Sequence, residues 1–212
     1  MTFLKIPRLQ VILPRVRLTY SSLFEKQHLN DMINTEEKRR YVATFILSKD
    51  NEKHVAVIKD MEEKEKQILS EIKLKKSAHP VYRCGDEFLE NIDDSDDAGK
   101  QRKELYAHRK NSWFIGSSNL RVPQLQLITR VNLDTQKDDN PFYDGCYVNA
   151  LIDLVPYQFN KKWTGVTKYV MFVQFSKEGE RLGGTEIINS SDYFDDKEDE
   201  DSDSDFKDED CF

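Results

Sequence analysis

The 212-residue sequence has few cysteines and no long apolar segment, and both shortages restrict what the protein can be. Its apolar runs are strand-sized, such as residues 44–47, whereas a membrane-spanning helix needs about 20 residues. Residues 1–5 lead into prolines and arginines, so we expect no secretory signal. Three scattered cysteines, Cys84, Cys146 and Cys211, argue against a disulfide framework and for a reducing compartment. We therefore expect one compact soluble domain.

Catalytic and metal-binding motifs are also missing. None of the four histidines, His28, His54, His79 and His108, lies in an acid–base or nucleophile motif. The sequence has no phosphate-binding glycine-rich loop, no Gly-x-Ser-x-Gly and no His-Glu-x-x-His. Cys84 could join two of the histidines, His79 and His108, in a zinc site, but no further pair of ligands completes the set. We therefore expect no cofactor, no metal and no enzymatic activity.

Charge is distributed unevenly along the chain. The net charge is −7, with 32 Lys and Arg against 39 Asp and Glu. Residues 191–212 hold 12 acidic residues and two lysines, and residues 86–97 hold seven acidic residues and no basic one. Without these two segments the chain has 30 basic and 20 acidic side chains, a net charge of +10. A basic body with separate acidic segments is typical of a polyanion-binding surface with an interaction tail.

The periodicity of apolar residues predicts mostly strands. Residues 15–20 alternate apolar and polar side chains, as a half-buried strand does, and residues 41–47 are apolar on both faces, as in a central strand. One amphipathic helix is predicted over residues 51–76, with Asp50 as its N-cap. Further strands are predicted at residues 112–117, 122–131, 145–159 and 164–175.

The order of these elements predicts the fold class and the domain boundaries. About six strands and one helix, without β-α-β alternation, predict a mainly β protein built as a small antiparallel barrel. Residues 78–111 show no sustained period and are expected to form a long insertion loop. Residues 191–212 cannot bury enough apolar surface to fold, so we expect a disordered acidic tail after a domain of residues 1–190.

Basic and aromatic residues adjoin in several parts of the chain. Single-stranded nucleic acid is bound by a positive groove that follows the backbone and by aromatic rings that stack on bases. The chain brings the two residue types together at residues 39–41, 102–106, 109–114, 161–163 and 168–169. Trp163 falls in a predicted hairpin turn, which offers little core to an indole, so we interpret it as a stacking residue. This pattern predicts a surface for single-stranded nucleic acid.

The acidic tail closes on an aromatic residue. Residues 199–205 consist of five acidic residues and two serines, and a further acidic cluster precedes Phe212 by one residue. A phenylalanine beside a free carboxylate offers an apolar anchor together with negative charge, the kind of short motif that a partner protein recognises. The residues expected to bind a partner are Asp208, Glu209, Asp210 and Phe212.

Two stretches carry a family likeness: residues 142–150, Phe-Tyr-Asp-Gly-Cys-Tyr-Val-Asn-Ala, and residues 165–175. Their order along the chain, followed by the acidic tail with its terminal aromatic residue, resembles the phage-type single-stranded-DNA-binding proteins. The similarity covers most of the chain. The acidic run at residues 86–97 and the long lysine-rich helix depart from the family pattern. The resemblance implies an OB-fold, a five-stranded barrel, with an acidic C-terminal tail. Weaker matches lie at residues 15–24, 41–50, 113–119 and 178–184.

The resemblance also implies a role. The family coats single-stranded DNA without sequence preference during phage DNA replication, recombination and repair, in the cytoplasm of a bacterial host. Its tail recruits replication proteins such as a polymerase, helicase or primase, and is expected to occupy the DNA groove when DNA is absent. The sequence leaves open an RNA-binding OB-fold protein, which a 2′-hydroxyl preference would reveal, and an adaptor that binds only proteins. Homodimerisation is left open as well.

The predicted DNA-binding residues fall into three groups. Three residues are expected to lie on the rim of the groove: Arg39, Arg109 and Trp113. The predicted hairpin is expected to clamp the strand with Lys161, Lys162 and Trp163. The strands are expected to line the groove with Arg15, Arg17, Arg130, Tyr147, Tyr157, Lys168 and Tyr169.

Overall fold

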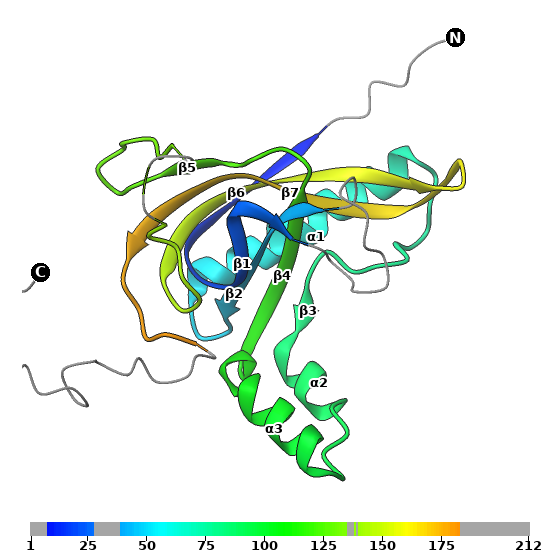
Figure 1. The fold of residues 1–212 in the computed structure, drawn as a ribbon. Coiled ribbons are helices and arrows are strands. Elements are labelled where there is room, and N and C mark those ends of the chain that lie inside the picture. Colours follow the sequence, from blue (N-terminus) through cyan, green and yellow to red (C-terminus); the bar gives the residue numbers. More distant parts are fainter. Residues whose placement is uncertain (1–7, 28–38, 135–137, 139, 183–212) are drawn as a thin grey trace, which may run out of the picture.

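The computed structural model describes residues 8–27, 39–134, 138 and 140–182. Figure 1 shows a curved sheet that closes into a barrel, with a helical projection below it. The helices are α1 (Glu52–Glu71), α2 (Gly85–Glu90), α3 (Asp97–Leu105) and the 3-10 helix η2 (Ala107–Arg109). The strands are β1 (Leu9–Gln27), β2 (Arg40–Ser48), β3 (Arg83–Cys84), β4 (Ser112–Asn119), β5 (Gln124–Gln126), β6 (Tyr147–Phe159) and β7 (Lys162–Lys177).

The strands form one sheet that closes on itself. Their order is β3-β4-β2-β1-β6-β7-β5, and every pair is antiparallel except β5 with β7. The Asn119 side-chain amide, at the end of β4, donates a hydrogen bond to the Val170 carbonyl of β7 at 3.1 Å. Strands β1, β2, β4, β7 and β6 therefore enclose a five-stranded, partly open barrel, the architecture of the OB-fold.

This arrangement confirms the predicted mainly β barrel and adds to it. The described sheet has seven strands rather than five or six, because β3 and β5 extend it at its two edges. The pairing of β5 with β7 is parallel, which a purely antiparallel barrel would not contain. The described residues also form three α-helices rather than one.

Alternating apolar residues fill the barrel interior. The inward residues of β6 are at most 2% exposed: Val148, Ala150, Ile152 and Leu154. On β2 the inward residues are at most 1% exposed: Ala43, Phe45 and Leu47. On the outward face of β2, Val42 and Ile46 are also buried, in agreement with a central strand.

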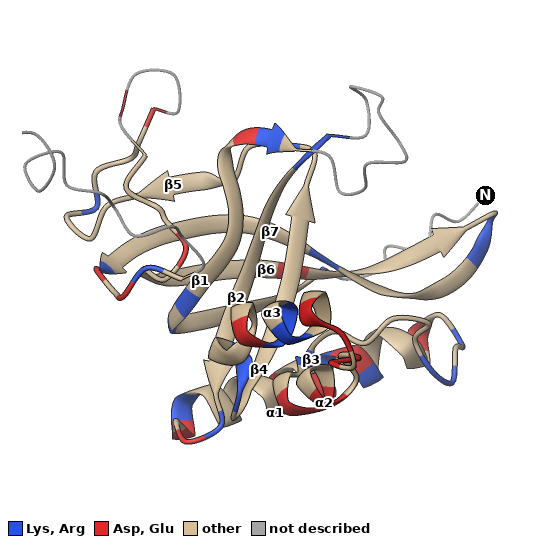
Figure 2. Ribbon diagram, turned by 60° about the horizontal axis from the view of Figure 1, so that its bottom comes forward, with Lys and Arg blue, Asp and Glu red and all other residues tan. Residues whose placement is uncertain are grey.

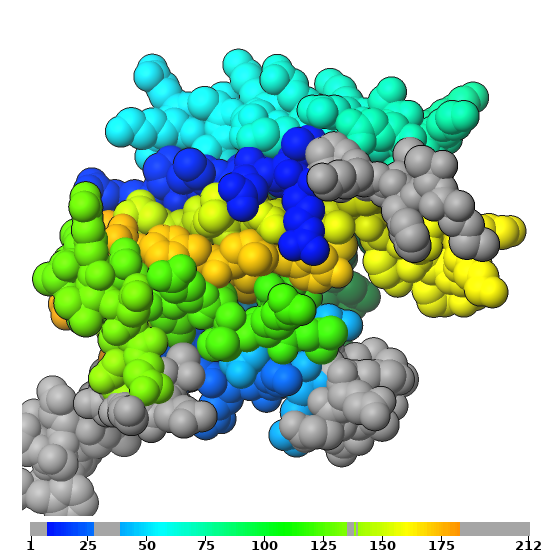
Figure 3. Space-filling model, turned by 90° about the horizontal axis from the view of Figure 1, so that it is seen from above, coloured from blue at the N-terminus to red at the C-terminus, as the bar shows by residue number. Residues whose placement is uncertain are grey.

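Helix α1 packs its apolar side against the barrel, mainly against β1 and β6. Figure 3 shows it in cyan along one side of the molecule. Its N-cap is Asn51, whose side chain accepts a hydrogen bond from the Lys53 backbone N–H at 3.0 Å, rather than the predicted Asp50. The helix ends at Glu71 instead of near residue 76, and Lys73 follows with a positive φ of 55°. No described helix is both long and apolar enough to cross a membrane.

Residues 78–111 contain β3, α2, α3 and η2, where the sequence predicted a long loop. The acidic residues of this insertion satisfy backbone and side-chain donors. The Asp96 carboxylate accepts from the Gly99 backbone N–H at 2.7 Å, as a helix N-cap does. The Asp86 carboxylate accepts from Lys49 Nζ at 2.6 Å and from the Asn111 backbone N–H at 2.8 Å. The Lys49 hydrogen bond is the main reason that the pKa of Asp86 is lowered. Figure 2 shows acidic residues on all three α-helices.

Two glycines provide a matched test of how tightly this insertion packs. Gly85 begins α2 against the backbone carbonyl of Arg109, and a built Cβ would collide with that carbonyl. We expect Gly85→Ala to lower the free energy of unfolding by about 1–3 kcal/mol, because the backbone must move apart. At roughly 2–4 °C per kcal/mol, the melting temperature falls by several degrees.

The control is Gly116→Ala on β4, where the nearest atom to a built Cβ is Thr44 Oγ1 at 4.0 Å. We expect this variant to unfold within about 0.5 kcal/mol of the parent protein in denaturant or thermal melts. Equal stability of the two alanine variants would contradict the close packing of α2 on η2.

Candidate nucleic-acid interface

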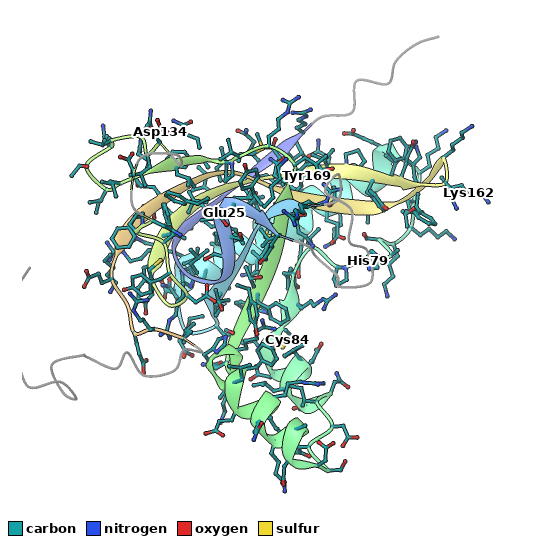
Figure 4. All side chains as sticks on the ribbon, in the orientation of Figure 1. Glu25, His79, Cys84, Asp134, Lys162 and Tyr169 are labelled. Atoms are coloured by element: carbon teal, nitrogen blue, oxygen red, sulfur yellow. The ribbon has the colours of Figure 1, made fainter. Side chains whose placement is uncertain are left out.

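A groove of about 510 Å³ lies over the outward face of β2 and β4, beside β7. A smaller hollow of about 210 Å³ continues it, because the two share Thr44, Gly116 and Lys168. In Figure 4 the labelled His79 lies on the segment that approaches β7. The residues that line the groove are Thr44, His79, Pro80, Val81, Tyr82, Arg83, Arg109, Phe114, Gly116 and Lys168.

Strand alternation creates the floor of the groove. Thr44 of β2 pairs with Gly116 of β4, and their neighbours Phe45 and Ile115 point into the core. Thr44 and Gly116 must therefore face outward. Because Gly116 has no side chain, part of the floor is bare backbone with open space above it.

The wall of the groove is the segment of residues 77–84, which crosses from β7 to β4. The Ala78 backbone N–H donates to the Thr164 carbonyl at 2.8 Å, and Ser77 Oγ accepts from the Val166 backbone N–H at 3.1 Å. This approach is so close that a Cβ at Gly165 would collide with the Ser77 side chain. At its far end the segment becomes β3, which pairs with β4.

The groove is electropositive. His79, Arg83, Arg109 and Lys168 line it, and no carboxylate stands among the described lining residues. Lys168 Nζ donates a hydrogen bond to the Pro80 carbonyl at 3.1 Å. The pKa of Lys168 is lowered mainly by burial, and the nearby Arg83 charge lowers it further.

Arg109 lines the groove and is only 6% exposed. The sequence placed it on the rim, but its guanidinium is surrounded by four aromatic rings. The guanidinium carbon lies 4.4 Å from the ring centroids of Tyr106 and Phe114, 4.7 Å from that of Phe88 and 5.5 Å from that of Tyr20. Cations are attracted to aromatic faces at such distances. Burial lowers the pKa of Arg109.

Trp113 faces a different hollow. This hollow of about 1020 Å³ lies on the other side of residues 80–84, between α1 and α2. The Trp113 ring meets Tyr82 edge-on at 6.5 Å, and Lys49 Nζ lies 5.7 Å from its centroid. The structure therefore does not bring Trp113 onto the rim of the groove.

Other predicted groove residues are engaged elsewhere. Arg17 donates to the Glu180 carbonyl at 2.7 Å and forms an ion pair with the Glu180 carboxylate at 3.5 Å. Lys177 Nζ lies 4.5 Å from the ring centroid of Tyr147. Arg15 is exposed on β1, and Arg130 is exposed in the turn after β5. None of Arg15, Arg17, Arg130 and Tyr147 lines the groove.

The β6–β7 hairpin extends beyond the barrel, and Figure 4 shows Lys162 at its tip. Lys161 and Lys162 are exposed, as predicted, and the Tyr157 side chain is 38% exposed. Trp163 is half-buried and packs against the core instead of standing free. Phe159, which the sequence analysis did not select, is 60% exposed on the same hairpin.

The remaining predicted residues have no place in the groove. Tyr169 is half-buried on β7 opposite Asp153, and Arg39 is half-buried directly before β2. The four predicted tail residues, Asp208, Glu209, Asp210 and Phe212, lie outside the described residues. Among the described residues no cluster of His, Cys, Asp and Glu could hold a metal ion.

Comparison with known proteins identifies the family. Residues 9–206 match the family model of the single-stranded-DNA-binding protein of Enterobacter phage Enc34. The chain belongs to this family. The resemblance inferred from the sequence is thereby confirmed. No curated protein sequence matches this Enc34-family chain.

Three solved structures of the bacteriophage Enc34 protein share the fold of this Enc34-family chain. The complex with single-stranded DNA gives a TM-score of 0.61 at 19% identity, covering 82% of this chain and 89% of that chain. A second structure of the same protein gives 0.60 at 17% identity, covering 88% and 90%. A C-terminal truncation gives 0.60 at 18% identity, covering 82% and 88%.

Sequence reasoning missed several groove residues of this Enc34-family protein, above all Arg83 and Gly116. An isolated glycine within a strand often marks the close approach of another group, and Gly116 was a usable signal of that kind. Arg83 carried no such signal, because its place depends on how residues 77–84 cross between two distant strands.

The charges around Lys168 lead to a titration prediction for this Enc34-family protein. We expect Lys168 to lose its proton at lower pH than an ordinary lysine. Arg83→Gln should raise the pKa of Lys168, because it removes a like charge, and Glu65→Gln should lower it, because the Glu65 carboxylate raises it. NMR titration of the lysine side-chain signals measures both shifts. Shifts of the same sign in the two variants would contradict this arrangement.

Proposed function

We propose that this protein binds single-stranded DNA without reading its sequence, and that it is not an enzyme. The observation that carries the proposal is the groove over β2 and β4, lined by Arg83, Arg109 and Lys168 and by no described carboxylate. OB-fold barrels bind oligonucleotides on the face of their second and third strands, which here are β2 and β4. One neighbour of the same fold, the phage Enc34 protein, was solved in complex with single-stranded DNA.

Two kinds of contact are available to hold the strand. The groove cations neutralise phosphates and release condensed counterions, so that affinity falls as salt rises. The exposed rings of Tyr157 and Phe159 on the β6–β7 hairpin stack on bases, which contributes about 1–3 kcal/mol per base. Neither contact depends on the base identity, so the proposed binding is sequence-independent.

The biological role follows from family membership and from the charge pattern. We propose that the protein coats and protects single-stranded DNA in phage DNA replication, recombination and repair, in the cytoplasm of a bacterial host. The acidic segment 191–212, with a net charge of −10, competes with DNA for the groove and recruits a polymerase, helicase or primase. Homodimerisation stays a prediction of the same kind.

Deletion of the acidic segment tests the proposal directly. In fluorescence anisotropy with labelled oligo-dT, we expect tight binding by the full chain that weakens steeply with salt. We expect tighter binding by residues 1–190, because the net −10 segment no longer competes for the cations. Duplex DNA and oligo-U of the same length serve as competitors and should displace the oligo-dT less effectively.

Each of three other results would change the interpretation. Unchanged or weaker binding by residues 1–190 would remove the competition model. Stronger displacement by oligo-U would favour an RNA-binding protein. No binding by either chain at low salt would end the nucleic-acid proposal and favour a protein adaptor.

A pair of hairpin variants separates stacking from packing. We expect Phe159→Ala to weaken oligo-dT binding by about 1–3 kcal/mol with little change in stability, because the ring is 60% exposed. We expect Trp163→Ala mainly to lower the free energy of unfolding, by about 1–3 kcal/mol, because its ring packs against the core. Anisotropy and denaturant unfolding of both variants measure the contrast, and the reverse pattern would make Trp163 the stacking residue.

A further inference from the structure

Arg109 is a buried cation whose hydrogen-bonding capacity is incompletely used. Its side-chain Nε is buried and has no hydrogen-bond partner among the described residues. The four surrounding rings attract the positive charge, but they supply no lone pairs in the plane of the N–H donors. A buried donor without an acceptor is costly. Nε itself is closed to solvent, but Arg109 also lines the groove, so an acceptor from outside the chain reaches it through its other N–H donors.

Two further cations face the same groove. The Arg83 charge lowers the pKa of both Arg109 and Lys168, so Arg83 lies within electrostatic reach of each of them, and all three line the groove. The acidic group that acts on Lys168 is Glu65 of α1, which belongs to the neighbouring larger hollow. The groove itself therefore concentrates positive charge that no described lining residue offsets. An anion in the groove would relieve the repulsion of Arg83 with Arg109 and with Lys168.

The shape of the site favours a phosphate group within a chain. Guanidinium groups match the geometry of phosphate oxygens, and two of the three cations are arginines. The groove of about 510 Å³ is larger than a single phosphate, and its bare floor at Gly116 leaves room for the chain to continue.

We propose that Arg83, Arg109 and Lys168 form a fixed subsite for one internal phosphate of the DNA backbone, which anchors the strand in the groove. The proposal rests on the proposed function and deepens it. The aromatic rings hold Arg109 in place before DNA arrives, so its binding costs little side-chain entropy. The exposed lysines at the hairpin tip lack this advantage.

Charge-removing variants test the subsite. Arg83→Gln and Lys168→Gln should each weaken oligo-dT binding about tenfold, as expected for the loss of one charge-assisted contact. Each should also reduce the slope of log affinity against log salt by about 1. Arg109→Gln should do the same where it folds. The matched control is Lys59→Gln on the exposed side of α1, away from the groove, and it should change neither quantity.

Three probes test whether the subsite takes an internal phosphate of the strand, a terminal 5′-phosphate or a free phosphate ion. Oligo-dT with a 5′-hydroxyl should bind as tightly as oligo-dT with a 5′-phosphate, because the subsite takes an internal phosphate. Inorganic phosphate at millimolar concentration should shift the amide NMR signal of Gly116 in the parent protein, and less so in Lys168→Gln. A clear preference for the 5′-phosphate would overturn the assignment to an internal phosphate.

The outcome also separates this proposal from the function on which it rests. Folded Arg83→Gln and Lys168→Gln variants with an unchanged salt slope would overturn the subsite while single-stranded DNA binding stands. A parent protein that fails to bind oligo-dT at low salt would overturn the proposed function. In that case the titration with inorganic phosphate still decides whether the three cations bind an anion.

Discussion

The groove depends on how closely the segment of residues 77–84 is held against the barrel. At one end Ser77 accepts a backbone hydrogen bond from β7, at a distance that only glycine at position 165 permits. At the other end Arg83 pairs with Phe114 of β4. Between these anchors the segment crosses the space between two barrel strands, separates the groove from the larger hollow behind it and carries one of the groove cations. Without this crossing, the outward face of β2 and β4 would be an open sheet surface.

The acidic insertion has a structural purpose that its composition conceals. Its carboxylates cap α3 and bind Lys49 and the backbone of Asn111. Helices α2 and η2 pack against β4, and α3 packs against η2. Through this fold the insertion supplies Phe88 and Tyr106, two of the four rings around Arg109. Negative charge at the periphery thus stabilises the position of a positive charge in the groove.

The sequence predicted the barrel better than the site, for physical reasons. Apolar patterning along a strand is a local signal, so the central strand β2, which is apolar on both faces, could be read directly from residues 41–47. Helices α2 and α3 could not, because they are short and the only fully buried residue of each is a glycine, so neither carries an apolar stripe. Arg17 and Tyr147 had suitable side chains for a DNA groove, but Glu180 and Lys177 engage them from the end of the domain. A residue type can be read from the sequence, whereas its partner across the fold cannot.

Strand β7 is the last described strand, so it is synthesised after every other part of the described barrel. This order determines when during synthesis the groove can form. It supplies Lys168, the Val170 carbonyl that joins β4 to close the barrel, and the Thr164 carbonyl that holds residues 77–84. A nascent chain that has not yet produced β7 therefore has neither a closed barrel nor a groove wall. Contacts between segments so distant along the chain form slowly compared with local ones. The groove is consequently complete only after β7 has been synthesised, because the Lys168 side chain, the barrel closure and the hold on residues 77–84 all need that strand.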